Sequence, residues 1–313
     1  MADLSLFDLT GKKALVTGGA VGIGRGYATA LAMAGADVAV VDIDLQTTEK
    51  TCAAIQAMGR DSMAVCCDVT DKEQVQSMVA QVVEGFGRLD IGVNNAGIVI
   101  LGGDEELDQA AWDKVIAVNL TGVFLCAQAQ AQQMIRQTPV EGKIINTASM
   151  SARIANCNAS YDASKAGIVH MTRTLAAEWG RFNINVNCIS PSYIMTPMHA
   201  STPTVVRERI RELTPLGHVE RPEDLYGAVV FLASTASNYV TGHDLLVDGG
   251  HTLNAWLTPL SRDIAPRVSP DEEIVQMKYD LDAMGVPYDA DGINPDLHPE
   301  IADAFKGAFG LTD

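Results

Sequence analysis

Two kinds of segment alternate along the first 250 residues, and this alternation limits the possible folds more than any other feature of the sequence. Short apolar runs rich in β-branched residues are separated by longer stretches with helical spacing, such as residues 24–36 and 72–87. Apolar runs without strict polar alternation are typical of strands buried on both faces of a parallel sheet. The runs predict strands at residues 12–18, 36–44, 62–69, 89–97, 143–149, 184–191 and 243–250. We therefore expect an α/β fold with a single doubly wound parallel sheet, Rossmann-like, flanked by helices.

The alternation ends near residue 252 and divides the chain into two parts. No linker interrupts residues 1–252, which are predicted to form one catalytic domain around the sheet. In residues 253–313 the strand patterns stop, and Pro, Asp and Gly become frequent. With so little apolar core of its own, this mostly helical or irregular C-terminal extension is expected to pack on the main domain or on a neighbouring subunit.

One helix is clearly marked in the extension. Ser269 is expected as its N-cap, Pro270 at its first position and Glu272 at the capping-box position, and Gly285 is expected to end it. A second, shorter helix is predicted to begin near Pro299. Residues 289–294, DADGIN, resemble part of a calcium loop but lack the third acidic position and the distal Glu, so we predict a plain turn and no metal site.

The charge and the cysteines exclude several classes of protein. The formal net charge of −17 opposes binding to nucleic acid, and residues 253–313 alone hold twelve acidic and four basic side chains. Because no run of about 18 apolar residues and no secretory signal is present, we expect no membrane partner and a cytoplasmic location. The cysteines have no metal-ligand spacing and are expected to be free thiols: Cys52, Cys66, Cys67, Cys126, Cys157 and Cys188.

A glycine-rich turn follows the first predicted strand. The sequence runs directly from that strand into TGGAVGIG, residues 17–24, and then into a helix. The diphosphate of a dinucleotide requires backbone amides at close range and the positive end of a helix. Side chains at Gly18, Gly22 and Gly24 would block that approach, so this turn is predicted to bind the cofactor.

An acidic residue at the end of the second strand favours NAD over NADP. Asp42 lies 18 residues after Gly24, where a carboxylate can accept hydrogen bonds from the adenosine ribose hydroxyls. The same carboxylate would repel a 2′-phosphate. No basic side chain stands at Val21 or Ile43, where it could bind that phosphate.

Tyr161 and Lys165 are spaced four residues apart in a stretch with a helical pattern, which places them one turn apart on one helical face. A phenol with its ordinary pKa near 10 is a poor base at neutral pH. A neighbouring ammonium group favours the phenolate and lowers that pKa, which makes Tyr161 a usable general acid and base.

These motifs, in this order, resemble the short-chain dehydrogenase/reductase family over about residues 8–252. Besides the glycine-rich turn and the Tyr161/Lys165 pair, the resemblance rests on Asp68-Val69, on Asn94 to Gly97, on Asn119, on Ser149 and on Asp248 to Gly250. It implies an enzyme that moves a hydride between a nicotinamide cofactor and a secondary alcohol or its ketone.

The resemblance also implies roles for individual residues. Ser149 would hold the substrate oxygen, and Tyr161 would take the hydroxyl proton as the hydride leaves carbon. Lys165 would lower the pKa of the phenol and hold the nicotinamide ribose, while Asn119 would anchor a water that relays the proton outward. The implied cofactor-binding residues are Gly18, Gly22, Ile23, Gly24, Asp42, Asp68, Val69, Asn95, Ala96, Gly97, Tyr161, Lys165, Pro191, Ile194 and Thr196.

Two departures from the family pattern affect the site. After the sixth strand, Pro191 is followed by Ser192 where most members have Gly, so Ser192 would be strained if that position requires a positive φ. Ser149 lies 12 residues before Tyr161, closer than is usual, which shortens the loop over residues 150–160. Ser151 is the alternative candidate for the hydroxyl role.

The substrate is less well defined than the cofactor. Residues 146–156 and 189–198 resemble those of mannitol, arabinitol or sorbose enzymes, which favours a polyol or a sugar. The alternatives are a bulkier alicyclic, aromatic or steroid alcohol and, outside enzymes, an NAD-sensing or scaffold protein. The family resemblance further implies a homodimer or homotetramer. The extension is expected either to close over an active site or to cover a subunit surface.

Overall fold

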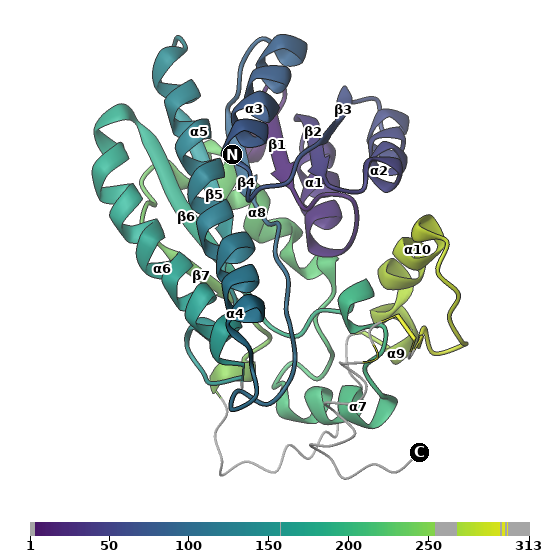
Figure 1. The fold of residues 1–313 in the computed structure, drawn as a ribbon. Coiled ribbons are helices and arrows are strands. Elements are labelled where there is room, and N and C mark those ends of the chain that lie inside the picture. Colours follow the sequence, from purple (N-terminus) through teal and green to yellow (C-terminus); the bar gives the residue numbers. More distant parts are fainter. Residues whose placement is uncertain (1–3, 157, 254–267, 295, 298, 300–313) are drawn as a thin grey trace.

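The computed structural model describes residues 4–156, 158–253, 268–294, 296–297 and 299. Its centre is one fully parallel sheet in the order β3-β2-β1-β4-β5-β6-β7 (Figure 1). The strands are β1 (Lys13–Thr17), β2 (Asp37–Asp42), β3 (Ser62–Cys66), β4 (Ile91–Asn94), β5 (Gly142–Thr147), β6 (Ile184–Pro191) and β7 (Asp244–Val247). Each lies within a predicted apolar run, except that β5 begins one residue earlier, at Gly142. The expected doubly wound α/β fold is confirmed.

Helices cover both faces of the sheet. The helices are α1 (Gly22–Met33), α2 (Leu45–Ala57), α3 (Lys72–Phe86), α4 (Gln109–Ile116), α5 (Val123–Arg136), α6 (Ala159–Trp179), α7 (Thr204–Leu213), α8 (Tyr226–Ala233), α9 (Pro270–Glu273) and α10 (Val275–Met284). Apolar side chains of α1, α2 and α8 form the core on one face, and those of α3, α5 and α6 form it on the other. The strands lie between these two cores, which explains why their sequences are apolar without alternation.

The order of the strands places a crevice between β1 and β4. Strands β1 to β3 extend to one side of the sheet and β4 to β7 to the other, so the connections after β1 and β4 leave in opposite directions. In a parallel sheet, such a reversal opens a crevice at the carboxyl ends of the strands. Thr17 of β1 lies opposite Asn94 of β4 at this point, so the glycine-rich turn begins at the crevice.

A long helical stretch, Gln109–Arg136, joins α4, a π-helical segment (Ala117–Gly122) and α5. By length and composition alone this stretch could cross a membrane, a test that core helices of soluble proteins also pass. Its residues Cys126, Ala127 and Met134 are buried in the core against the sheet, which accounts for its apolar composition.

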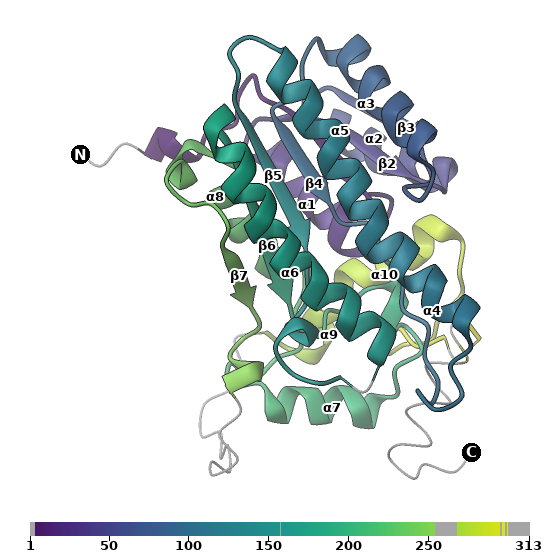
Figure 2. The same ribbon diagram turned by 60° about the vertical axis from the view of Figure 1, so that its left-hand side comes forward.

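The described part of the extension lies with α7 beyond the carboxyl ends of the strands, as two views of the ribbon show (Figures 1 and 2). Ser269 and Glu272 form the predicted capping box, and Gly285 ends α10 with a φ of +73°. The helix is interrupted at Ile274, which the sequence pattern did not predict. In residues 289–294 the Asp289 carboxylate accepts hydrogen bonds from the amides of Asp291 and Ile293, as in a turn. The helix predicted to begin near Pro299 falls on residues 300–313, which lie outside the described residues.

Candidate active site

A cavity of about 610 Å³ opens at the crevice, within the size range of small-molecule and cofactor sites. All of the cofactor-binding residues predicted from the sequence line its wall except Gly24. Of the four predicted catalytic residues, Ser149, Tyr161 and Lys165 line it, whereas Asn119 is buried behind the wall. The fold therefore brings together residues from positions 18 to 196 of the chain.

The glycine-rich turn has the shape that a diphosphate requires. Gly18 and Gly22 adopt left-handed φ values of +61° and +59°, which favour glycine. A Cβ on Gly24 would overlap the carbonyl oxygen of Gly18, so Gly24 keeps the turn tight without facing the cavity. The first amides of α1, including that of Ile23 at the cavity wall, have no partner within the helix. The turn thus fits the diphosphate of a dinucleotide.

Asp42 lies at the cavity wall at the end of β2. Its carboxylate accepts hydrogen bonds from the amides of Ala20, Ile43 and Asp44, at 3.2, 2.8 and 3.3 Å, and so also ties β2 to the glycine-rich turn. Burial raises the pKa of Asp42, and the three amide hydrogen bonds act against that rise. A carboxylate oxygen can accept more than one hydrogen bond, so ribose hydroxyls can still bind there.

Asp68 and Asn95 secure the loops after β3 and β4. The Asp68 carboxylate accepts hydrogen bonds from the amide and hydroxyl of Thr70, which fixes the loop at this edge of the cavity. The side-chain amide of Asn95 donates to the carbonyl of Gly18 at 3.1 Å, and its backbone amide donates to the Thr17 hydroxyl. These contacts hold the glycine-rich turn against the loop after β4.

Tyr161 stands in the first turn of α6, whose start is fixed by the Asn158 side chain accepting from the Tyr161 amide. Ser149, which follows β5, lies close enough to the phenol to act on its pKa and lower it. Ser149 lines the cavity, whereas Ser151, the alternative candidate, is buried outside the cavity wall. The geometry favours Ser149 as the hydroxyl partner of the phenol.

Lys165 lies one turn further along α6, with its ammonium group 5.4 Å from the centre of the Tyr161 ring. It donates a hydrogen bond to the Thr147 carbonyl at 2.9 Å. Burial lowers the pKa of Lys165 to about 8 and raises the pKa of Tyr161 to about 12, with Ser149 acting against the latter rise. The sequence predicted a lowered phenol pKa. Burial outweighs the opposing effect of Ser149, so the pKa of the phenol is raised and the predicted direction is wrong.

Asn119 lies in the π-helical segment Ala117–Gly122 and is fully buried. Its side-chain oxygen accepts from the Ile98 amide, and its side-chain amide donates to the Ile98 carbonyl and the Ser164 hydroxyl. Both amide hydrogens are therefore occupied, and the side chain fixes the loop after β4. A π-helical turn often occurs at a functional site because it shifts the hydrogen bonding of the backbone.

Ser192 is not strained. Among the described residues, Asn183 is the non-glycine residue with a positive φ, so Ser192 does not adopt the conformation that would require Gly. Its amide donates to a carboxylate oxygen of Glu220 at 2.6 Å. Glu220 is buried, and burial raises its pKa well above the ordinary value.

Sequence reasoning missed several residues at the site. Pro197, Met198 and His199, which follow the predicted Thr196, line the cavity as a short 3-10 helix. Asp280 of the extension accepts a hydrogen bond from the Gly22 amide at 2.7 Å. No spacing or motif marked Asp280, because its partner lies 258 residues earlier in the chain.

Comparisons with known proteins agree with this geometry. A sequence family described as enoyl-(acyl carrier protein) reductase matches residues 18–252. D-threitol dehydrogenase from Mycolicibacterium smegmatis is 39% identical over 79% of this chain and 95% of its own length. A short-chain type dehydrogenase/reductase from Mycobacterium marinum is 41% identical over 80% of this chain and 98% of its own, with a TM-score of 0.76.

A third comparison is with a gluconate 5-dehydrogenase from Burkholderia cenocepacia, whose crystal structure contains NADP and tartrate. It is 33% identical over 80% of this chain and 99% of its own, with a TM-score of 0.76. These similarities and a matched family region that covers most of the chain agree on the family of the protein. The chain belongs to the short-chain dehydrogenase/reductase family, whose members are oxidoreductases that act on alcohols with a nicotinamide cofactor.

Proposed function

We propose that the protein is an NAD-dependent dehydrogenase of a polyol or a sugar. The observation that carries the proposal is the arrangement of Ser149, Tyr161 and Lys165 at the wall of a cavity whose other wall is the glycine-rich turn and Asp42. The names of the threitol and gluconate enzymes support a small hydroxylated substrate.

In this proposal the cofactor contacts the residues predicted from the sequence. The amides at the start of α1 bind its diphosphate, except that of Gly22, which donates to Asp280. Asp42 accepts from its adenosine ribose, and Lys165 holds its second ribose. The loop from Asp68 to Val69 flanks the adenine, and Ile194 and Thr196 meet the nicotinamide carboxamide. When bound, the nicotinamide accepts or gives the hydride, and its positive charge in the oxidised form favours the phenolate.

The protein supplies the proton transfer. Ser149 holds the alcohol oxygen beside the Tyr161 phenol, and the phenolate takes the hydroxyl proton during oxidation. In the reverse direction the phenol returns that proton to the ketone oxygen. Lys165 keeps a positive charge near the phenolate, and Asn119 fixes the loop behind the pair. These roles require Tyr161 to lose and regain a proton in every cycle.

The choice of NAD rests on Asp42. Its carboxylate would stand where a 2′-phosphate must bind, and two negative charges at that distance repel each other. The structure of the gluconate enzyme contains NADP, so a relative of this chain binds the phosphorylated cofactor.

Absorbance at 340 nm tests the function directly. The protein is mixed with NAD or NADP and a panel of four- to six-carbon polyols, sugar acids, cyclic alcohols and a steroid alcohol. We expect NADH to form fastest with an open-chain polyol or a sugar. Rapid turnover of only the cyclic or steroid alcohols would contradict the proposed substrate class and favour a bulkier alcohol. Tight NAD binding without turnover of any alcohol would favour an NAD-sensing protein.

We further propose a cytoplasmic homodimer or homotetramer. Trp112 and Phe124 of the long helical stretch are 38% and 37% exposed, which leaves apolar area for contact with a second copy. The described cysteines are free thiols, as suits a reducing compartment. Light scattering on the full chain would measure the mass, and a monomer at micromolar concentration would contradict the assembly.

A further inference from the structure

The segment that follows β6 forms a lid, residues 194–213, with two different faces. Ile194, Thr196 and His199 contribute to the cavity wall. Met195 and Ala200 are fully buried away from the cavity, in an apolar cluster with Met277 and Leu281 of α10. Val206 and Ile210 of α7 belong to the same cluster. The lid is therefore a thin layer between the active site and the C-terminal extension.

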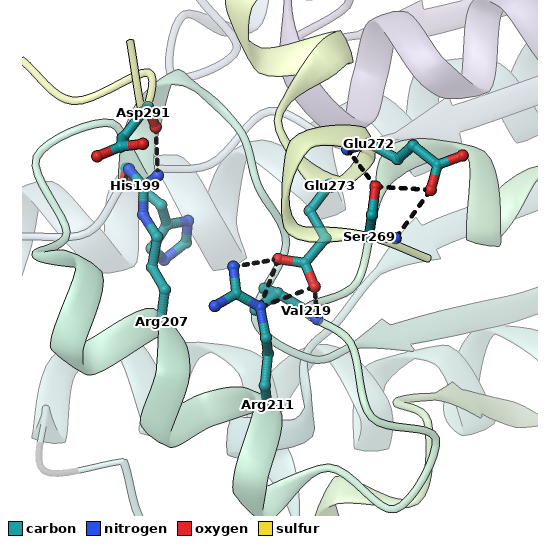
Figure 3. A network of polar contacts seen from close by, with 8 residues as sticks. All are labelled: His199, Arg207, Arg211, Val219, Ser269, Glu272, Glu273 and Asp291. Carbon is teal, nitrogen blue, oxygen red and sulfur yellow. Dashed lines mark hydrogen bonds and ion pairs between the residues drawn. The ribbon is translucent and has the colours of Figure 1, made fainter. Parts of the chain in front are cut away.

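A buried carboxylate ties the extension to the lid helix. Glu273, at the end of α9, is 1% exposed. Both of its oxygens accept hydrogen bonds from the Arg211 guanidinium of α7, at 2.6 to 2.9 Å, and one also accepts from the Val219 amide at 3.0 Å (Figure 3). Such a bidentate pair fixes the relative orientation of its two partners as well as their distance.

The turn after α10 makes a second attachment. The Asn294 amide donates to the Ala200 carbonyl at 3.1 Å. Arg207 of α7 donates to the carbonyl of Asp291 at 2.8 Å, as Figure 3 shows. The extension thus holds both the start of the lid and its helix.

The other side of α10 reaches the glycine-rich turn. Asp280 is fully buried, accepts from the Gly22 amide and forms an ion pair with Arg25 of α1. The Arg25 guanidinium also stacks on the Tyr279 ring at 3.7 Å, and Lys50 of α2 donates to the Ala283 carbonyl. These contacts anchor α10 to the part of the domain that binds the diphosphate.

We propose that residues 268–294 are a positioning element of the active site, which holds the lid over the nicotinamide end of the cavity. α10 is anchored on α1 and α2 through Asp280 and its neighbours, and α9 carries the lid through Glu273. Glu273 and Met277 are positioning residues, since they act through the lid and do not line the cavity. The inference deepens the proposed function and rests on it, because it concerns how the same alcohol site is closed.

Two pairs of matched variants test the role in the full chain. Glu273→Gln removes the charge that orients Arg211, and Glu272→Gln is its control, because Glu272 caps its own helix at the surface. Met277→Ala removes a buried side chain beneath the lid, and Met284→Ala is its control at the partly exposed end of α10. Two measurements apply to all four variants: amide hydrogen exchange of residues 194–213 without cofactor, and steady-state kinetics with the best alcohol.

We expect Glu273→Gln and Met277→Ala to speed exchange of the lid amides and to raise the KM for the alcohol about tenfold, with kcat changed less than about threefold. A looser lid weakens binding in the ground state and the transition state alike, whereas general unfolding would lower kcat as well. The controls should match the parent. Lid exchange and KM that equal those of the controls in both variants would overturn the proposal. If the parent protein oxidises no alcohol, the proposed function fails, but the exchange comparison still decides whether the extension holds the lid.

Discussion

The two sides of the cavity have different origins. The floor is built from the ends of parallel strands and the turns that follow them, including Gly18, Asp42 and Ser149. The roof is the lid, and its outer face rests on α9 and α10 from the far end of the chain. The groups proposed to transfer the proton and to bind the diphosphate and adenosine belong to the floor, whereas Ile194, Thr196 and His199 line the cavity from the roof. The contrast teaches that the groups for proton transfer lie at the ends of strands, while the position of the roof depends on contacts with a segment from the far end of the chain.

The sharpest test of the floor is Tyr161→Phe, which removes the proton-transferring hydroxyl and keeps the ring. We expect kcat to fall about a thousandfold, as for loss of a general acid or base, with the NADH dissociation constant within about twofold of the parent. Steady-state activity assays measure kcat, and NADH fluorescence titration measures the dissociation constant. Tyr239→Phe, at a fully exposed tyrosine, is the control. Activity of Tyr161→Phe within tenfold of the parent would refute the assigned base.

Gly24→Ala tests whether the turn must be tight. The added Cβ would overlap the Gly18 carbonyl and the Asn95 side chain, so the turn must open. We expect the NADH dissociation constant to rise about a hundredfold, which corresponds to about 2.7 kcal/mol. Gly227→Ala in α8 is the matched control, because a Cβ there meets open space. It should leave NADH binding unchanged and raise the free energy of unfolding by about 0.5–1 kcal/mol. Equal NADH affinity in both variants would contradict this role of Gly24.

Asp42→Ala tests the basis for the choice of cofactor. Without the carboxylate, a 2′-phosphate is no longer repelled and the ribose hydroxyls lose an acceptor. We expect the ratio of kcat/KM for NAD to that for NADP to fall by about tenfold to a hundredfold. This corresponds to a change of about 1.4 to 2.8 kcal/mol in the preference for NAD. Glu49→Gln, which removes a charge from the exposed surface of α2, should leave the ratio unchanged. An unchanged ratio in Asp42→Ala would remove the argument for NAD.

The pH dependence tests the proton transfer at the floor. Burial raises the pKa of Tyr161 to about 12, so only a small share of the phenol is ionised near pH 7. Oxidation requires the ionised form, and kcat/KM for the alcohol should therefore rise with pH, by up to about tenfold per unit. The rise should become shallower above about pH 8, where Lys165 loses its charge. Reduction of the ketone, which uses the protonated phenol, should not rise. A flat oxidation profile from pH 6 to 9 would show that another group titrates in the reaction.

The roof should respond more weakly and more selectively. His199→Ala removes a side chain that lines the cavity from the lid. We expect the KM for the best alcohol to rise about fivefold and the ranking of alcohols to change, as for loss of one polar contact of about 1 kcal/mol. NADH affinity should stay within twofold, and His170→Ala on the exposed face of α6 is the control. A large loss of kcat with an unchanged ranking of alcohols would indicate that His199 acts in the reaction itself and not in the choice of alcohol.

The sequence predicted the floor well because each of its parts is local. Apolar runs mark the strands. Gly18 follows β1 directly, Asp42 is the last residue of β2, and Ser149 lies two residues after the end of β5. Ser269 and Glu272 likewise form a capping box within four residues, so the helix start was predictable even in the extension.

The roof could not be predicted in this way. Glu273 meets Arg211 across 62 residues, and neither residue belongs to a pattern that names its partner. Ile274, which separates α9 from α10, belongs to the apolar cluster beneath the lid. The direction of the Tyr161 pKa also depended on the whole fold, because burial of the phenol is set by segments from several parts of the chain. Ser192 does not adopt a positive φ, and its amide binds Glu220, a residue that no local motif connects to it.

The hydrogen bond between Asp280 and the Gly22 amide has a consequence for the nascent chain during translation. Translation proceeds from the amino terminus, so the first strand and its turn leave the ribosome long before residue 280 is made. Until then the amide that Asp280 will bind faces water or another acceptor. A chain that ended before residue 280 would contain the sequence of every strand but would lack the carboxylate that accepts from the Gly22 amide.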